Sequence, residues 1–129
     1  MKLAITPDQY NVRIPLKFSD STSTSNGGLS SISGSLTGLT GYYWKSDGTP
    51  STSMTLSGLG TFGVYSPGTL IAVDSTYAPG HAEYCLPNAA KPPVGGGSTL
   101  ICFKGGTNMC QLDVELVTVP SGSYFTKNL

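Results

Sequence analysis

The only histidine of the chain lies in the segment GHAEYCLP, where His81, Glu83 and Cys85 occupy every second position. A His-x-Glu pair is half of the zinc-deaminase signature, in which the histidine binds zinc and the glutamate moves a proton. The other half, Pro-Cys-x-x-Cys, does not occur, because Cys102 and Cys110 are spaced too far apart. The sequence therefore excludes a deaminase of this class.

A simpler metal site on this segment is also disfavoured. In a strand, residues i, i+2 and i+4 share one face, so His81, Glu83 and Cys85 would point together. Three ligands in line on one strand cannot surround an ion tetrahedrally. The alternate set is apolar and suits the core face of a strand: Ala82, Tyr84 and Leu86. We expect the polar set to form the outward face, solvated or at an interface, and we expect no metal and no other cofactor.

Other catalytic patterns are missing from the sequence. Nucleophilic catalysis needs a base beside the nucleophile, and a single histidine leaves few choices. Neither a Gly-x-Ser-x-Gly elbow nor a Walker loop occurs. Asp113 and Glu115 share one face of an expected edge-like strand, which predicts a solvated strand face rather than an acidic catalytic pair. We therefore predict a protein that is not an enzyme.

The remaining cysteines leave two alternatives open. A turn at residues 105–107 would place Cys102 directly opposite Cys110, where a disulfide is geometrically demanding but feasible. The N-terminus lacks the apolar region of a signal peptide, which predicts folding in the cytoplasm and favours free thiols in the core. A disulfide formed after release into an oxidising medium is the alternative.

The composition limits the classes of partner. The chain has 129 residues, enough for one domain, and only 11% are charged, with seven basic and seven acidic side chains. Nucleic acid binding requires clustered Lys and Arg, and anionic membranes require a polybasic run. The sequence has neither. We therefore expect no nucleic acid partner and no membrane partner.

Short alternating segments and turn residues predict an all-β protein. Residues 10–18 alternate strictly, and Pro15 makes this an edge strand or an irregular one. Further strands are expected at 40–45, 53–56, 61–65, 70–73 and 81–86, and residues 98–119 form a hairpin around Gly105 and Gly106. The sequence therefore predicts a single β-sandwich of seven or eight short antiparallel strands with extended termini, either immunoglobulin-like or jelly-roll. The sandwich spans 1–119, with a long Ser/Thr/Gly-rich loop at 19–35, and 120–129 form a C-terminal arm.

The order of these segments resembles that of small β-sandwich structural proteins of tailed bacteriophages. The similar elements are the opening MKLAITPDQYNVRIPLKF, the hairpin GLTGYYWKSDGTPSTSMTLSG, PGHAEYCLPNAA and the final GGGSTLICFKGGTNMCQLDVELVTV. Ala82 stands where the family pattern favours an aromatic residue, so we expect the core beneath it to be filled from elsewhere, with Tyr84 as the candidate.

The resemblance implies a non-enzymatic virion component, assembled in the host cytoplasm. We expect a capsid cement or decoration protein that binds the major capsid protein and itself, as a dimer or trimer, and stabilises the assembled head. The expected interface residues are Met1, Leu3, Ile5, Tyr124, Phe125 and Leu129. The alternative is a tail, baseplate or head-fibre module that mediates assembly or binds host saccharides, with Tyr42, Tyr43 and Trp44 as stacking aromatics, although alternate members of this run are expected in the core.

Overall fold

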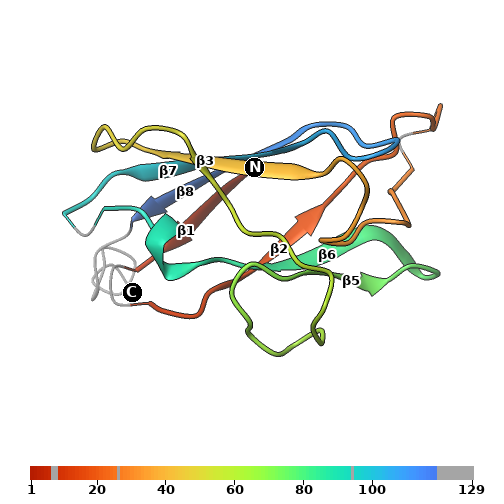
Figure 1. The fold of residues 1–129 in the computed structure, drawn as a ribbon, viewed down its shortest axis with the longest axis horizontal. Helices are drawn as coiled ribbons and strands as arrows, with labels where there is room; N and C mark the ends of the chain where they lie inside the picture. The colour runs from red at the N-terminus through yellow and green to blue at the C-terminus, as the bar shows by residue number, and fades with distance from the viewer. Residues whose placement is uncertain (7–8, 26, 94, 119–129) are drawn as a thin grey trace, which may run out of the picture.

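The computed structural model describes residues 1–6, 9–25, 27–93 and 95–118, which form two packed β-sheets (Figure 1). The elements, in chain order, are β1 (Lys2–Ile5), β2 (Arg13–Lys17), β3 (Thr40–Lys45), β4 (Thr52–Ser53), β5 (Leu70–Asp74), β6 (Ala78–Cys85), the short 3-10 helix η1 (Asn88–Ala90), β7 (Ser98–Lys104) and β8 (Leu112–Thr118). The predicted all-β sandwich is therefore confirmed. Within the described residues, no helix is long and apolar enough to span a bilayer.

The strand order distinguishes between the two expected sandwich types. One sheet has the order β1-β8-β7-β3-β4 and the other β2-β6-β5. If β2 is taken as strand B, these are the G-F-C-C′ and B-E-D orders of an immunoglobulin-type sandwich, with the first strand added beside G. In a jelly roll, strands adjacent in sequence such as β7 and β8 would lie in different sheets. The order is therefore immunoglobulin-like.

One strand pair departs from the expected antiparallel arrangement. β1 runs parallel to β8, with Lys2 opposite Glu115 and Ile5 opposite Thr118, whereas the strand pairs that do not include β1 are antiparallel. After β1 the chain crosses to the other sheet, where it forms β2. Because no hairpin joins β1 to its neighbour, nothing in the connectivity imposes an antiparallel direction on it.

β2 shows how the alternating sequence builds the core. Its inward side chains are buried together with those of the flanking residues, and these are Val12, Ile14, Leu16 and Phe18. Tyr10, which belongs to the same alternating set, lies beyond the strand and is exposed. β2 is an edge strand, as Pro15 predicts, since proline cannot donate to a second neighbour.

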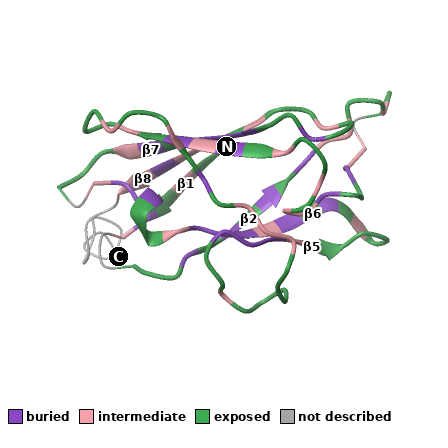
Figure 2. Cartoon of the chain, viewed as in Figure 1, coloured by how far each residue is buried: buried purple, intermediate pink, exposed green. Residues whose placement is uncertain are grey.

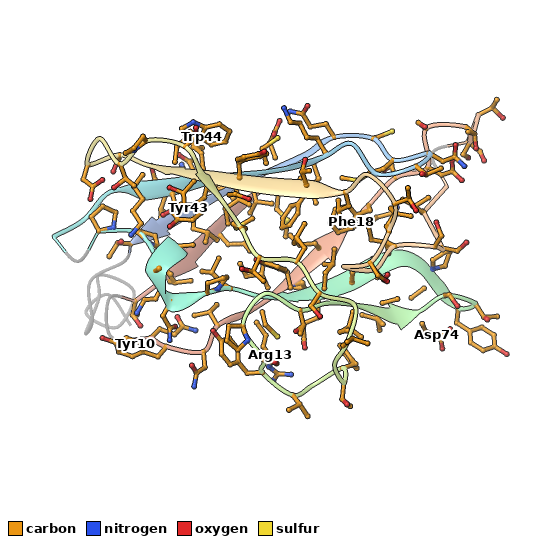
Figure 3. All side chains as sticks on the ribbon, viewed as in Figure 1. Tyr10, Arg13, Phe18, Tyr43, Trp44 and Asp74 are labelled. Carbon is orange, nitrogen blue, oxygen red and sulfur yellow. The ribbon has the colours of Figure 1, made fainter. Side chains whose placement is uncertain are left out.

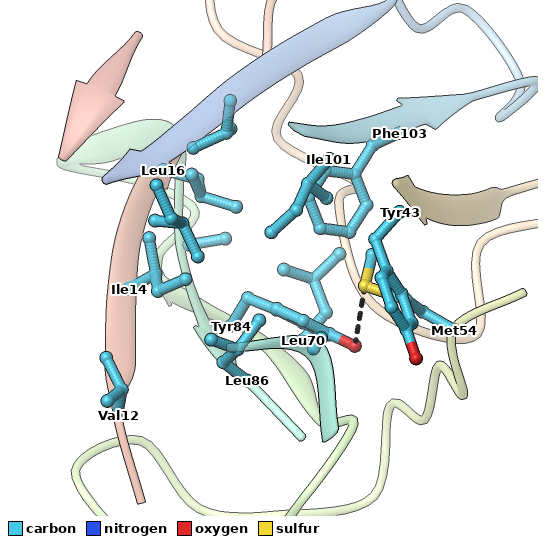
Figure 4. Close-up of a cluster of buried hydrophobic side chains, with 14 of the residues drawn as sticks. Val12, Ile14, Leu16, Tyr43, Met54, Leu70, Tyr84, Leu86, Ile101 and Phe103 are labelled. Atoms are coloured by element: carbon cyan, nitrogen blue, oxygen red, sulfur yellow. Dashed lines mark hydrogen bonds between the residues drawn. The ribbon is translucent and has the colours of Figure 1, made fainter. Parts of the chain in front are cut away.

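Three aromatic side chains join the two sheets, and Figure 4 shows two of them, Phe103 and Tyr84. Phe103 of β7 makes edge-to-face contacts with Tyr84 of β6, at a centroid distance of 5.2 Å, and with Phe18, at 5.6 Å. All three are completely buried. The Tyr84 hydroxyl donates a hydrogen bond to the Thr55 carbonyl oxygen at 3.1 Å. The prediction that Tyr84 fills the core beside the small Ala82 thus agrees with its position.

The Ser/Thr/Gly-rich loop at 19–35 is held by the chain's own core. Leu29 and Ile32 are buried in the cluster between the sheets, and the Leu29 amide donates to the Phe18 carbonyl oxygen at 2.9 Å. The loop and β6 approach each other so closely that position 80 must be glycine. There φ is +82°, and a Cβ would collide with the Phe18 carbonyl oxygen. The described residues of the loop are therefore fixed by contacts within the chain itself.

A predicted strand at 61–65 is wrong. These residues form turns within a loop, residues 57–68, that leaves the sheets and returns to β5. The loop contains Gly58, Gly60, Gly63 and Gly68, and glycine in such density favours turns over a strand interior. Its two ends are joined by a hydrogen bond from the Ser57 amide to the Gly68 carbonyl oxygen, at 2.9 Å.

The anchoring role of Ile32 can be tested by truncation. We expect Ile32→Ala to lower the free energy of unfolding by about 2–5 kcal/mol, because it leaves a cavity between the sheets. Leu59→Ala is the matched control, since Leu59 also lies in a long loop but is exposed, and its effect should stay within about 0.5 kcal/mol. Chemical denaturation measures both, and equal, small losses would contradict the anchoring.

Candidate functional site

The polar residues of β6 are placed on the outer face of the three-stranded sheet, with different exposures. His81 is exposed, Glu83 is half-buried, and Cys85 is buried because the loop at 57–68 covers it. The Cys85 thiol lies 3.8 Å from the Val64 carbonyl oxygen. Among the described residues, no three His, Cys, Asp or Glu side chains are grouped so that they could hold a metal ion. The three side chains share a face but form no common site.

Glu83 fastens the loop to the sheet. Its carboxylate accepts a hydrogen bond from the Gly63 amide at 3.2 Å and pairs with the Arg13 guanidinium at 3.3 Å. Further along the loop, the Tyr65 hydroxyl donates to the Leu86 carbonyl oxygen at 2.7 Å. Charged and backbone hydrogen bonds at several points along the loop fix its path across the outer face of the sheet. The glutamate therefore has a structural role here.

The loop exposes three apolar side chains although it is well anchored. The exposed fractions are 87% for Leu59, 50% for Phe62 and 59% for Val64. In Figure 1 the loop hangs beneath the sheet of β5 and β6, and Figure 2 shows most of it as exposed. Single exposed apolar residues are ordinary, but several on one fixed loop mark a surface suited to binding. We call these three residues the apolar loop.

The aromatic run of β3 is divided between the interior and the surface. Tyr43 is buried, whereas Trp44 is 41% exposed and Tyr42 is half-buried on the same outward face. In Figure 3 the Trp44 side chain stands above the five-stranded sheet and Tyr43 points into the sandwich. The expectation that alternate members are core residues agrees with this arrangement. Trp44 and Tyr42 lie on the face opposite to the apolar loop.

Trp44 forms one wall of an open hollow on this outer face. The hollow measures about 610 Å³ and is lined by Trp44, Leu100, Ile101, Cys102, Gln111 and Asp113. Leu100 lies opposite Trp44 in the β3–β7 register and is 51% exposed. At the other wall, the Gln111 amide donates a hydrogen bond to the Asp113 carboxylate at 3.1 Å. The hollow thus has an apolar side and a polar side.

The expected N-terminal interface residues lie in β1. Ile5 is buried in the core, Leu3 packs against it in part, and Met1 is exposed. The side chain of Ile5 is therefore used by the fold itself. Met1 and Leu112 lie on one side of a second hollow of about 440 Å³, with Lys17 and His81 on the other. The expected C-terminal contacts, Tyr124, Phe125 and Leu129, lie outside the described residues.

The hairpin register that would place Cys102 opposite Cys110 is wrong. Cys102 lies opposite Asp113 in the β7–β8 register, because the connection between these strands is longer than a tight turn. All three cysteines are free; Cys85 and Cys102 are buried and Cys110 is exposed, so Cys110 is no core thiol. Burial, followed by the neighbouring Asp113 carboxylate, raises the pKa of the Cys102 thiol.

The expected pair of acids, Asp113 and Glu115, shares the outer face of β8 as predicted, but β8 lies between β1 and β7 and is not an edge strand. Glu115 pairs with Lys2 at 3.5 Å. Asp113 is hydrogen-bonded to Gln111 instead. The two carboxylates therefore have separate partners, and nothing in this arrangement resembles an acid–base pair in a cleft.

Several residues of these surfaces were missed by sequence reasoning. Phe62 and Val64 were assigned to a strand at 61–65 and Leu59 to no element, although the surrounding glycines are the signal for a loop. Leu100 and Asp113 share the outer face with Trp44 only because β7 pairs with both β3 and β8. Such a shared face depends on sheet order, which period-two alternation does not contain.

Comparison with known proteins places the chain in no family. No protein-family model matches it, and neither a curated protein nor a solved structure matches it significantly.

The thiols offer a direct test of the β7–β8 register. We expect one cysteine, Cys110, to react promptly with a thiol reagent in the native protein, and all three to react after unfolding. Cys102 should lag because burial keeps its thiol protonated and shielded. Mass spectrometry of the labelled peptides identifies the sites. A native mass two hydrogens lower, with no prompt reaction at Cys110, would instead indicate a disulfide.

Proposed function

We propose that the chain is a non-enzymatic structural protein of a virion, a capsid decoration protein that binds the assembled head through its apolar loop. The exposure of Leu59, Phe62 and Val64 on an anchored loop is the observation that carries the proposal. The resemblance of the sequence elements to those of phage β-sandwich proteins supports the same function. On this proposal the partners are the major capsid protein and further copies of the chain.

The anchoring of the loop favours binding to a partner. An interface that must first order a segment loses part of its binding free energy to conformational entropy. Here the hydrogen bonds of Glu83, Tyr65 and Ser57 already fix the loop. Complete burial of one large apolar side chain contributes about 1.5–3 kcal/mol. Several such side chains per copy, repeated over a lattice, give an association that stabilises only the assembled shell.

The alternative is a tail, baseplate or head-fibre module. It would share the sandwich and the apolar loop, but its partner would be a tail protein or a host-surface saccharide rather than the shell. Binding to purified heads therefore distinguishes the two proposals. The outward placement of Tyr42 and Trp44 supports a saccharide ligand, because exposed aromatic rings can stack on sugars.

The proposal is tested by binding of the purified protein to empty capsid shells of the parent phage. We expect saturable binding, and we expect Phe62→Ala to raise the dissociation constant about tenfold or more, since lost burial of an aromatic ring exceeds ~1.4 kcal/mol. Tyr77→Ala is the matched control, because Tyr77 is 88% exposed and lies in the β5–β6 turn. Sedimentation of shells with bound protein measures both variants.

A truncated chain that ends at Val119 locates the rest of the contact. Loss of binding on truncation would assign part of the anchor to the predicted C-terminal arm at 120–129, and retained binding would leave the apolar loop as the main contact. Absence of binding to shells by the full chain would contradict the decoration function. Equal binding by Phe62→Ala and the unaltered protein would contradict the role of the loop.

A further inference from the structure

We propose that the hollow on the outer face of the five-stranded sheet is a binding site for a neutral saccharide, with Trp44 as the stacking platform. The site is separate from the apolar loop and lies on the opposite face of the sandwich (Figure 3). A saccharide site here is compatible with a protein of the phage head and with one of the tail. Its size, about 610 Å³, falls within the range of about 300–1,000 Å³ typical of small-ligand sites.

The apolar wall suits one face of a pyranose ring. Trp44 and Leu100 are directly paired across β3 and β7, and both remain exposed although neither lies in a flexible loop. A pyranose with mostly equatorial hydroxyls has axial C–H groups on its faces, and the negative face of an aromatic ring attracts them. Tyr42, two pairs further along the β3–β7 register, lies half-buried on the same outer face. Trp44 and Leu100 thus form the apolar wall against which one face of the sugar ring can pack.

The polar wall suits the hydroxyls at the rim of such a ring. A carboxylate offers about four acceptor positions, and the hydrogen bond from Gln111 orients the Asp113 carboxylate while leaving further positions available. The strands fix the distance between the two walls: β3 and β7 carry the apolar wall, and β8, on the other side of β7, carries Asp113. An apolar platform beside an oriented planar acceptor is the arrangement that fits a molecule with one apolar face and a hydroxyl rim.

The charge that lines the hollow favours a neutral ligand. Among the described residues, Asp113 is the charged one that lines the hollow, and it would repel phosphates and acidic sugars. Lys104 of the same sheet face does not line the hollow; its ammonium lies 6.0 Å from the centroid of the Tyr42 ring. A purely apolar ligand would desolvate the same carboxylate without offering it a hydrogen bond. A neutral sugar satisfies both walls. We therefore expect oligosaccharides of glucose or N-acetylglucosamine to bind, and sialylated or sulfated ones not to bind.

The sequence makes the test simple, because Trp44 is the only tryptophan of the chain. Titration of the full-length protein with cello- and chito-oligosaccharides should change the Trp44 fluorescence in a saturable way. By calorimetry, Trp44→Ala should raise the dissociation constant about tenfold or more, and Asp113→Asn should raise it less, because the amide keeps one acceptor. Tyr77→Ala, which removes an exposed aromatic ring elsewhere, should leave it unchanged.

Three outcomes would overturn the proposal. One is the absence of binding to these sugars and to every neutral glycan on an array by the folded protein. Another is loss of shell binding in Trp44→Ala, which would make the face a protein interface. The third is a saturable change of the Trp44 fluorescence with choline and none with sugars, which would make the ligand of the site a cation bound on the aromatic ring. Because shell binding is tested through Phe62, failure of either proposal can be distinguished from failure of the other.

Discussion

The edge-to-face cluster of Phe18, Tyr84 and Phe103 is the contact on which the rest of the structure depends. Phe103 comes from one sheet and Tyr84 from the other, so their contact sets how the sheets face each other. Burial raises the pKa of the Tyr84 phenol, which therefore keeps its proton and can donate to Thr55. That hydrogen bond holds the segment between β4 and the loop at 57–68, so the position of the apolar loop follows from the core.

The commitment of one strand face to this core determines what the other face presents. Because side chains alternate along a strand, burial of Tyr43 places Trp44 outside, and burial of Ile101 places Leu100 outside. The register between β3 and β7 then sets these two exposed residues side by side. The outer hollow is thus a consequence of core packing, and a slip by one residue would bury Trp44 and expose Tyr43.

The sequence predicted local features of the fold better than those that depend on sheet order. Alternation located β2 and its buried side chains, and Pro15 predicted an edge. The register of β7 and β8 could not be predicted, since two adjacent glycines mark a turn but do not fix where pairing resumes, and Cys102 consequently met Asp113 rather than Cys110. The role of Ile32 was hidden because isolated apolar residues in a serine-rich loop carry no periodic signal. Of the candidate sites, alternation predicted that the run at 42–44 would be divided between core and surface, but neither the outward face of Trp44 nor its neighbours from β7 and β8 could be predicted.

The two proposed sites differ in shape, and this difference limits what each can bind. The exposed side chains of the apolar loop stand out from its sheet, so their burial needs a partner with a complementary recess, as a protein surface can provide. The hollow beside Trp44 instead accepts a small ligand from solvent. Because the sheets lie back to back, a partner on the loop leaves the hollow uncovered. If the loop binds a shell, the Trp44 face points away from that shell, and a saccharide there would be met from outside.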